Sequence, residues 1–304
     1  MTVSDEDRAR SIRQRLLNEV RRRGETDRFT LERYAMERFL FRLGESRHTK
    51  QFVLKGAMLF TLWGGSVYRS TRDLDFTGYG PSDTDSVLEA IRQICETSTA
   101  DDGLAFDAAS MEAEPIRDQS EYVGLRIRLR AHLGRSSIPL QVDIGFGNAI
   151  EPPAEVVTFP TLLDDPPPRI FAYPKEAVVA EKTHAMVVLG DKNSRFKDFY
   201  DLFILASSFP FDGRRVSAGL AATFERRETP IDDAYPVALT SAFFEDDRRA
   251  QQWRSYRSQK ELSGAPADFS AVGELILRFL QPLWKSLASG QEHNQTWLPG
   301  GSWQ

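Results

Sequence analysis

Residues 69–76 of the chain read RSTRDLDF, with polar and apolar side chains alternating from Asp73 onward. This period of two predicts a strand from Asp73 to Thr77, in which Asp73 and Asp75 point to one face and the apolar residues point into the core. Two like charges on one sheet face repel each other, and a cation bound between them removes that repulsion. The stretch therefore predicts a sheet with an acidic face suited to Mg²⁺.

A third aspartate, Asp143, strengthens the metal interpretation. It lies on the polar face of the alternating run Leu140–Ile144. An Asp-x-Asp pair alone is common at strand ends and is more often merely solvated. With a third carboxylate the set suits Mg²⁺ that also binds the phosphates of a nucleoside triphosphate (NTP) for in-line attack at phosphorus.

The remaining pattern predicts an α+β fold. The run Val123–Arg130 alternates in the same way as Leu140–Ile144, and Gly134 lies between them, which indicates an antiparallel hairpin. Helical periodicity on both sides of these strands predicts flanking helices on a mixed sheet and a mainly helical C-terminal part. The expected helices span residues 5–24, 31–43, 56–63, 84–98, 174–190, 195–207, 213–226, 245–261 and 268–288.

Three consecutive prolines, Pro166–Pro168, stop regular structure and predict a domain boundary. We expect a sheet-containing core with N-terminal helices over residues 1–165. A helical domain that completes the active site is expected over residues 166–288, and a loosely ordered tail over residues 289–304.

Composition excludes several classes of protein. The 304 residues are 41% hydrophobic and carry a net charge of −5, which argues against a broadly basic nucleic-acid-coating protein. No apolar run is long enough to span a membrane, and the N-terminus is charged rather than signal-like. The single cysteine, Cys95, excludes an intramolecular disulfide framework. Together these features predict a cytoplasmic protein that does not bind a membrane.

Five motifs in order resemble the AbiEii/AbiGii toxin family, which includes the MenT-type toxins and has the DNA polymerase β-like nucleotidyltransferase fold. The resemblance covers roughly residues 50–205. The motifs are Leu54-Lys55-Gly56-Ala57-Met58, Arg69-x-Thr71-x-Asp73-Leu74-Asp75, Val142-Asp143-Ile144-Gly145, Val179-Ala180-Glu181-Lys182 and Arg195-Phe196-Lys197-Asp198-Phe199-Tyr200-Asp201-Leu202.

The resemblance implies the toxin half of a toxin–antitoxin pair, with a cognate antitoxin protein as partner. Its activity would be Mg²⁺-dependent transfer of a nucleotide from an NTP to RNA. The implied acceptor is the tRNA 3′ end, whose modification would block aminoacylation and translation.

The same resemblance assigns roles to individual residues. Lys182 would contact the triphosphate, while Asp198 and Asp201 would position Lys182 or bind substrate; their spacing does not choose between them. One departure is that Met58 replaces the hydroxyl residue usual in the first motif. The implied catalytic residues are Asp73, Asp75, Asp143, Lys182, Asp198 and Asp201, the metal ligands Asp73, Asp75 and Asp143, and the nucleotide-binding residues Lys55, Gly56, Ala57, Arg69, Thr71 and Lys182.

A row of basic residues suggests an RNA contact. Arg126, Arg128 and Arg130 share the predicted hairpin face that carries Asp143. A plain charged sheet face explains these arginines about as well, and Arg69 could equally pair with a carboxylate. Two further readings of the chain stay open: a catalytically silent RNA- or partner-binding module, and a transferase that modifies a protein or small-molecule hydroxyl. The predicted RNA-binding residues are Arg126, Arg128, Arg130, Arg195 and Lys197.

Overall fold

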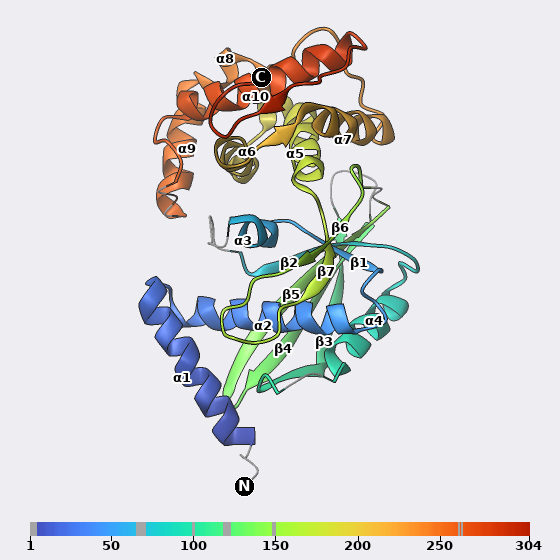
Figure 1. Cartoon of the computed structure of the whole chain (residues 1–304), viewed down its shortest axis with the longest axis vertical. Helices are drawn as coiled ribbons and strands as arrows, with labels where there is room; N and C mark the ends of the chain where they lie inside the picture. The colour runs from blue at the N-terminus through green and yellow to red at the C-terminus, as the bar shows by residue number, and fades with distance from the viewer. Residues whose placement is uncertain are drawn as a thin grey trace. The chain divides into compact units, whose positions relative to one another are not determined.

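The structure is a computed structural model that describes residues 5–64, 71–98, 101–117, 123–147, 150–260, 262 and 264–304. The chain forms two compact units (Figure 1). Unit 1 comprises Met1–Ala149 and Ala154–Tyr173, and unit 2 comprises Ile150–Pro153 and Pro174–Gln304.

Unit 1 is built on a mixed sheet. In the part of the chain that the structure describes, this sheet has seven strands in the order β3-β4-β5-β2-β1-β7-β6. Strand β2 runs parallel to β5, and β1 parallel to β7, while the other neighbours are antiparallel. The α+β fold class is therefore confirmed. The strands are β1 (Phe52–Lys55), β2 (Asp73–Gly78), β3 (Leu104–Arg117), β4 (Val123–Leu133), β5 (Ser136–Phe146), β6 (Glu155–Thr158) and β7 (Arg169–Ala172).

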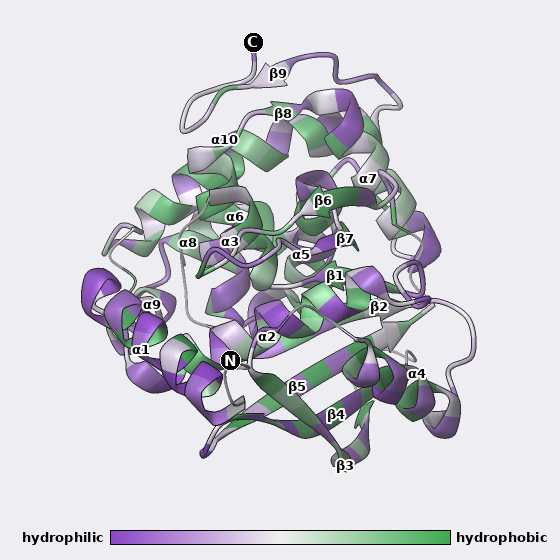
Figure 2. Cartoon of the chain, turned by 60° about the horizontal axis from the view of Figure 1, so that its bottom comes forward, coloured by the Kyte–Doolittle hydropathy of each residue, from purple (hydrophilic) through white to green (hydrophobic). Residues whose placement is uncertain are grey.

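Helices pack on the apolar side of this sheet. The hydropathy colours alternate along β4 and β5 (Figure 2), as the sequence predicts for strands with one buried face. The buried residues of α1 and α2 pack with Ala131, Leu133 and Ile138 in one core cluster. The polar residues of β4 and β5 consequently occupy the opposite face. The helices of unit 1 are α1 (Asp5–Arg23), α2 (Asp27–Glu45), α3 (Met58–Gly64) and α4 (Thr84–Glu96).

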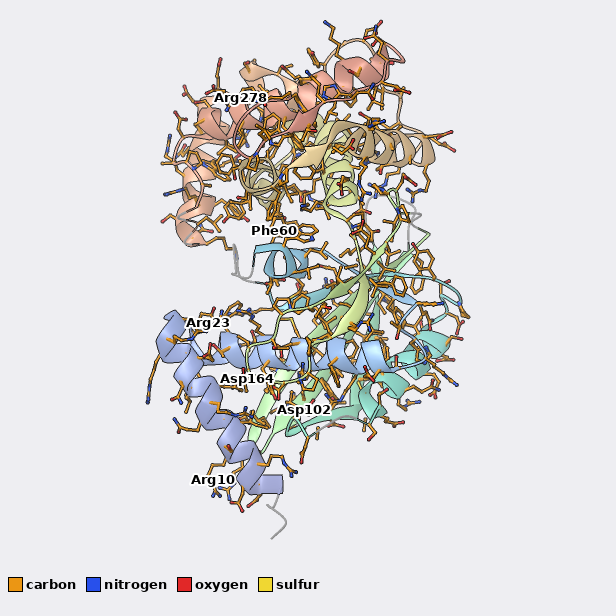
Figure 3. All side chains as sticks on the ribbon, viewed as in Figure 1. Arg10, Arg23, Phe60, Asp102, Asp164 and Arg278 are labelled. Atoms are coloured by element: carbon orange, nitrogen blue, oxygen red, sulfur yellow. The ribbon has the colours of Figure 1, made fainter. Side chains whose placement is uncertain are left out.

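Helix α2 begins at Asp27, before the expected start at residue 31. Thr26 caps its N-terminus by accepting a hydrogen bond from the Phe29 amide. A buried ion pair then ties the helix to the chain before β3, since Arg42 donates to both carboxylate oxygens of Asp102 at 2.6 and 3.1 Å. Asp102 is labelled in Figure 3. Arg42 also donates to the Leu104 carbonyl, so its guanidinium links α2 to the start of β3.

The three prolines lie inside unit 1 rather than between the units. They belong to the connection between β6 and β7, two strands that the sequence did not predict. Side chains of α2 hold this connection: Arg38 donates to the Pro166 carbonyl and the Tyr34 hydroxyl to Asp165. The units divide between Tyr173 and Pro174 instead of after Asp165, because β7 pairs with β1 and so stays with the sheet.

Unit 2 is helical, as its periodicity predicts. Strand β9 pairs with β8 and brings the end of the chain onto the helices. Trp297 is fully buried and donates to the Ala206 carbonyl, while Trp303 stacks on Phe279. Residues 289–304, expected to be loosely ordered, thus contribute large aromatic side chains to the packing of unit 2. Its elements are α5 (Lys175–Leu189), α6 (Phe196–Ser208), β8 (Phe211–Asp212), α7 (Gly213–Arg226), α8 (Ser241–Phe244), α9 (Asp247–Gln259), α10 (Phe269–Ala288) and β9 (Thr296–Trp297).

None of the described helices of either unit has the length and apolar character that crossing a membrane requires.

Candidate functional site

A row of charged residues runs across the polar side of the unit 1 sheet. The strand registers pair Lys55 with Asp75, Asp75 with Asp143, and Asp143 with Arg126. Arg126 is in turn paired with Glu114 on β3. We call these five residues the charged row; in it, two neighbouring carboxylates are flanked by a cation on each side.

The registers place the three predicted metal ligands on one face of the sheet. Asp75 and Asp143 are direct neighbours on the parallel strands β2 and β5, whereas Asp73 lies one row further along, opposite Gln141. All three aspartates are partly exposed. Among the residues that the structure describes, no group of three or more Asp, Glu, His or Cys side chains is arranged to hold one ion. Their role as metal ligands stays a prediction.

Asp143 makes a two-pronged contact with Arg126. The Arg126 Nε donates to Oδ1 at 2.9 Å and its Nη2 donates to Oδ2 at 2.7 Å. The amide of Gln141 also donates to Oδ2, at 3.3 Å. Hydrogen bonding to Asp143 raises the pKa of Arg126 above its usual value, so the guanidinium stays charged. The geometry thus gives Arg126, predicted to bind RNA, an intramolecular partner.

The turn after β1 brings backbone against Asp75. Gly56 has a φ of +74°, a conformation that a side chain disfavours. A Cβ atom at this position would lie 2.1 Å from Oδ2 of Asp75. Because Gly56 has no side chain, the Asp75 carboxylate can lie directly against the backbone of this turn.

The other predicted nucleotide-binding residues of unit 1 differ in their burial and in their contacts. Lys55 is half-buried beside Asp75 in the charged row, and the Ala57 side chain is buried. The Thr71 hydroxyl donates to the Asp73 carbonyl at 3.5 Å, at the start of β2. Arg69 lies outside the described residues.

The predicted residues of unit 2 form an ion-pair cluster between α5 and α6. The Lys182 ammonium contacts Asp198 Oδ1 at 3.0 Å and Asp201 Oδ2 at 2.7 Å. Arg195 Nε lies 2.8 Å from the other oxygen of Asp198. Asp198 and Asp201 are 2% and 1% exposed. Both aspartates hold the same ammonium, while Lys197 is exposed at the start of α6.

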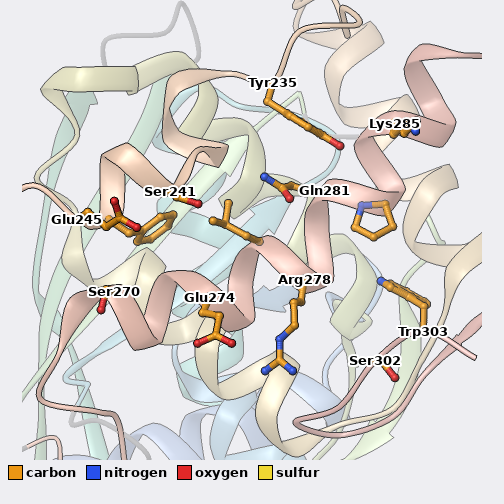
Figure 4. A pocket seen from close by; sticks show the side chains of 13 residues that line it. Tyr235, Ser241, Glu245, Ser270, Glu274, Arg278, Gln281, Lys285, Ser302 and Trp303 are labelled. Atoms are coloured by element: carbon orange, nitrogen blue, oxygen red, sulfur yellow. The ribbon is translucent and has the colours of Figure 1, made fainter.

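Unit 2 also contains a cavity along α10 that the sequence did not indicate. Its volume is about 810 Å³, and its lining includes Glu274, Arg278 and Trp303 (Figure 4). Pro282 in the helix has no N–H to donate, and the Trp303 indole donates to the Phe279 carbonyl nearby, at 3.0 Å. The cavity is lined by none of the predicted site residues.

Comparisons with known proteins identify the family. The family model for the nucleotidyl transferase AbiEii toxin, type IV toxin–antitoxin system, matches residues 38–274. A Helicobacter pylori protein assigned as a nucleotidyltransferase has a similar fold, with a TM-score of 0.53 at 14% identity over 88% of this chain and 100% of its own. JHP933 from Helicobacter pylori gives a TM-score of 0.51 at 14% identity over 87% of this chain and 95% of its own. No curated protein sequence matches the chain. Because the family model covers most of the sequence, this chain belongs to the AbiEii nucleotidyltransferase toxin family.

Proposed function

We propose that this protein transfers a nucleotide from an NTP to an RNA acceptor in a Mg²⁺-dependent reaction, and that the acceptor is the 3′ end of tRNA. A tRNA modified in this way would not be aminoacylated, which would stop translation. The observation that carries the proposal is the pairing of Asp75 with Asp143 on neighbouring parallel strands, against the backbone of Gly56. Family membership supports the transferase chemistry and the toxin role, and it implies a cognate antitoxin.

The donor set of the charged row fits Mg²⁺. Carboxylate oxygens are preferred ligands of this ion, which completes its shell with phosphates and water. Asp75 and Asp143 offer such oxygens side by side, with Asp73 one row away. When bound, the ion would offset the charge of the triphosphate. In this proposal one of the carboxylates accepts the proton of the attacking hydroxyl, and Lys182 contacts the triphosphate.

The decisive experiment is a label-transfer assay with the full chain. Each of the four NTPs, labelled at the α-phosphate, is incubated with Mg²⁺ and total tRNA, and parallel samples contain a protein mixture or a chelator. We expect label on the tRNA with one or more NTPs, none with the chelator, and a lower yield of tRNA that can be charged. Label on protein alone would replace tRNA with a protein hydroxyl. No transfer to any acceptor would overturn the proposal in favour of a binding module.

The Lys182 cluster provides a second test. Lys182→Met would remove the ammonium shared by two buried carboxylates, of which Asp198 keeps its contact with Arg195, and is expected to lower the free energy of unfolding by about 3 kcal/mol. Adding Asp198→Asn and Asp201→Asn to that variant removes the uncompensated charges and should recover part of the loss. Urea unfolding gives the stabilities, and label transfer should be lost in both variants.

The matched control is Lys192→Met, an exposed lysine between α5 and α6, which should change neither measurement. Normal transfer by the stabilised triple variant would contradict a contact of Lys182 with the triphosphate. It would leave the cluster a purely structural role.

A further inference from the structure

We propose that Arg126 is a positioning residue that exchanges partners during the reaction. Without ligands it holds Asp143, and when the metal and nucleotide bind it leaves Asp143 for the triphosphate. The proposal rests on the proposed function, because it takes Asp143 to belong to the metal site.

Arg126 and a bound metal ion would compete for one carboxylate. Arg126 donors contact both oxygens of Asp143, at 2.9 and 2.7 Å. A metal ion bound by the same oxygens would lie at about 2.1 Å from them, so a divalent cation and a guanidinium would face each other across one carboxylate. Like charges at that separation repel strongly. Arg126 therefore weakens the binding of a metal ion that arrives alone.

Arg126 is free enough in the structure to leave Asp143. Its side chain is 31% exposed, and its long stem allows the guanidinium to swing within the charged row. Two other acids act on Arg126: Asp73, which belongs to the proposed metal site, and Glu114, which lies 3.8 Å from Nη1 and is already bonded to Arg128 at 2.7 Å. Glu114 therefore competes little for a released Arg126.

Phosphate oxygens of the nucleotide would replace the carboxylate that Arg126 leaves. A guanidinium binds phosphate oxygens with the same two-pronged geometry that it uses for a carboxylate. When Asp143 binds the metal, the negatively charged phosphates of the NTP would become the new partner of Arg126. The exchange thus keeps both Arg126 and Asp143 paired with an opposite charge before and after binding, and it favours joint binding of metal and nucleotide over binding of metal alone.

If Arg126 exchanges partners, its loss should change the affinity for metal alone and the affinity for metal-bound nucleotide in opposite directions. A simple structural contact would not do so. Arg126→Gln is expected to raise the affinity for Mn²⁺ alone about tenfold and to lower the affinity for metal-bound nucleotide about tenfold, each the equivalent of one charge-assisted contact. If Arg126 only orders Asp143, the same substitution lowers both affinities. Arg126→Lys keeps the charge without the fork and should fall between the wild type and Arg126→Gln in both measurements.

The experiment uses the full-length chain and has readouts other than activity. Mn²⁺ binding is followed by the electron paramagnetic resonance signal of free Mn²⁺. Nucleotide binding is measured by calorimetry with the four α,β-imido NTP analogues at saturating Mn²⁺. Arg135→Gln is the matched control, because Arg135 is an exposed arginine in the turn between β4 and β5, outside the charged row; both of its affinities should stay at wild-type values.

Asp75→Asn separates failure of the exchange from failure of the proposed function. If Asp75→Asn removes Mn²⁺ binding while Arg126→Gln leaves it unchanged or weaker, the exchange is overturned and the metal site stands. If Mn²⁺ does not bind even to Arg126→Gln, or if its binding is unaffected by Asp75→Asn, both proposals are overturned. Tighter binding of Mn²⁺ and weaker binding of nucleotide in Arg126→Gln, against unchanged affinities in Arg135→Gln, is the result that supports the exchange.

Discussion

Replacing Asp75 with asparagine is expected to lower the rate of nucleotide transfer by about a thousandfold, the size of effect seen when a preorganised electrostatic contact is lost. The substitution keeps the shape of the side chain but removes its negative charge from between Lys55 and Asp143 in the charged row. Asp75 and Asp143 are direct neighbours on parallel strands, so the amide breaks the carboxylate pair proposed to hold the metal. The rate is measured by label transfer under saturating NTP and Mg²⁺.

The free energy of unfolding shows whether the lower transfer rate of Asp75→Asn results from misfolding. Like charges on facing strand positions destabilise a sheet, so Asp75→Asn should leave the free energy of unfolding unchanged or slightly higher. Asp85→Asn is the control, because Asp85 is exposed in the first turn of α4 and outside the row. Transfer at the wild-type rate by Asp75→Asn, or a loss that tracks unfolding in urea, would contradict the assigned role.

Gly56→Ala is expected to have the second largest effect, about a hundredfold on transfer together with about 3 kcal/mol of stability. The added methyl would lie 2.1 Å from Oδ2 of Asp75, so that either the carboxylate or the turn must move. The positive φ of Gly56 adds a backbone cost for any side chain. Activity and urea unfolding, measured on the same preparation, give the two effects.

Gly80→Ala is the matched control for this turn. Gly80 also has a positive φ, +91°, but a Cβ there would meet no atom within 4 Å. Alanine should therefore cost about 1 kcal/mol from backbone strain alone and leave transfer unchanged. Equal effects of the two substitutions on transfer would show that strain, and not contact with Asp75, explains Gly56→Ala.

The acidic face was predictable because it depends on local alternation. A period of two around Asp73 and around Asp143 is enough to put each aspartate on the polar face of its strand. The hairpin of β4 and β5 likewise follows from two alternating runs on either side of Gly134. Neither pattern contains the order of the strands, so the direct pairing of Asp75 with Asp143 appears only in the structure.

Contacts between distant segments could not be predicted. The Arg126–Asp143 contact depends on the exact register of β4 against β5, which a one-residue shift would abolish. Arg42 and Asp102 become a buried pair only when α2 lies on the sheet. The prolines were misinterpreted for a related reason: composition identifies a break in regular structure, but not whether the next strand rejoins the same sheet.

The division of the chain into units has a consequence for anyone who wants to study them apart. Residues 150–153 belong to unit 2 although sequence on both sides of them belongs to unit 1. Within unit 2, the Glu151 carbonyl would lie only 2.9 Å from a Cβ added to Gly219, so this short segment packs tightly against α7. A single cut or truncation, at the prolines or after Tyr173, cannot release two intact pieces, because the C-terminal fragment would lack a segment of its own packing. Separate expression would require a rearranged gene in which residues 150–153 are rejoined to residue 174 and the sheet is closed by a new connection.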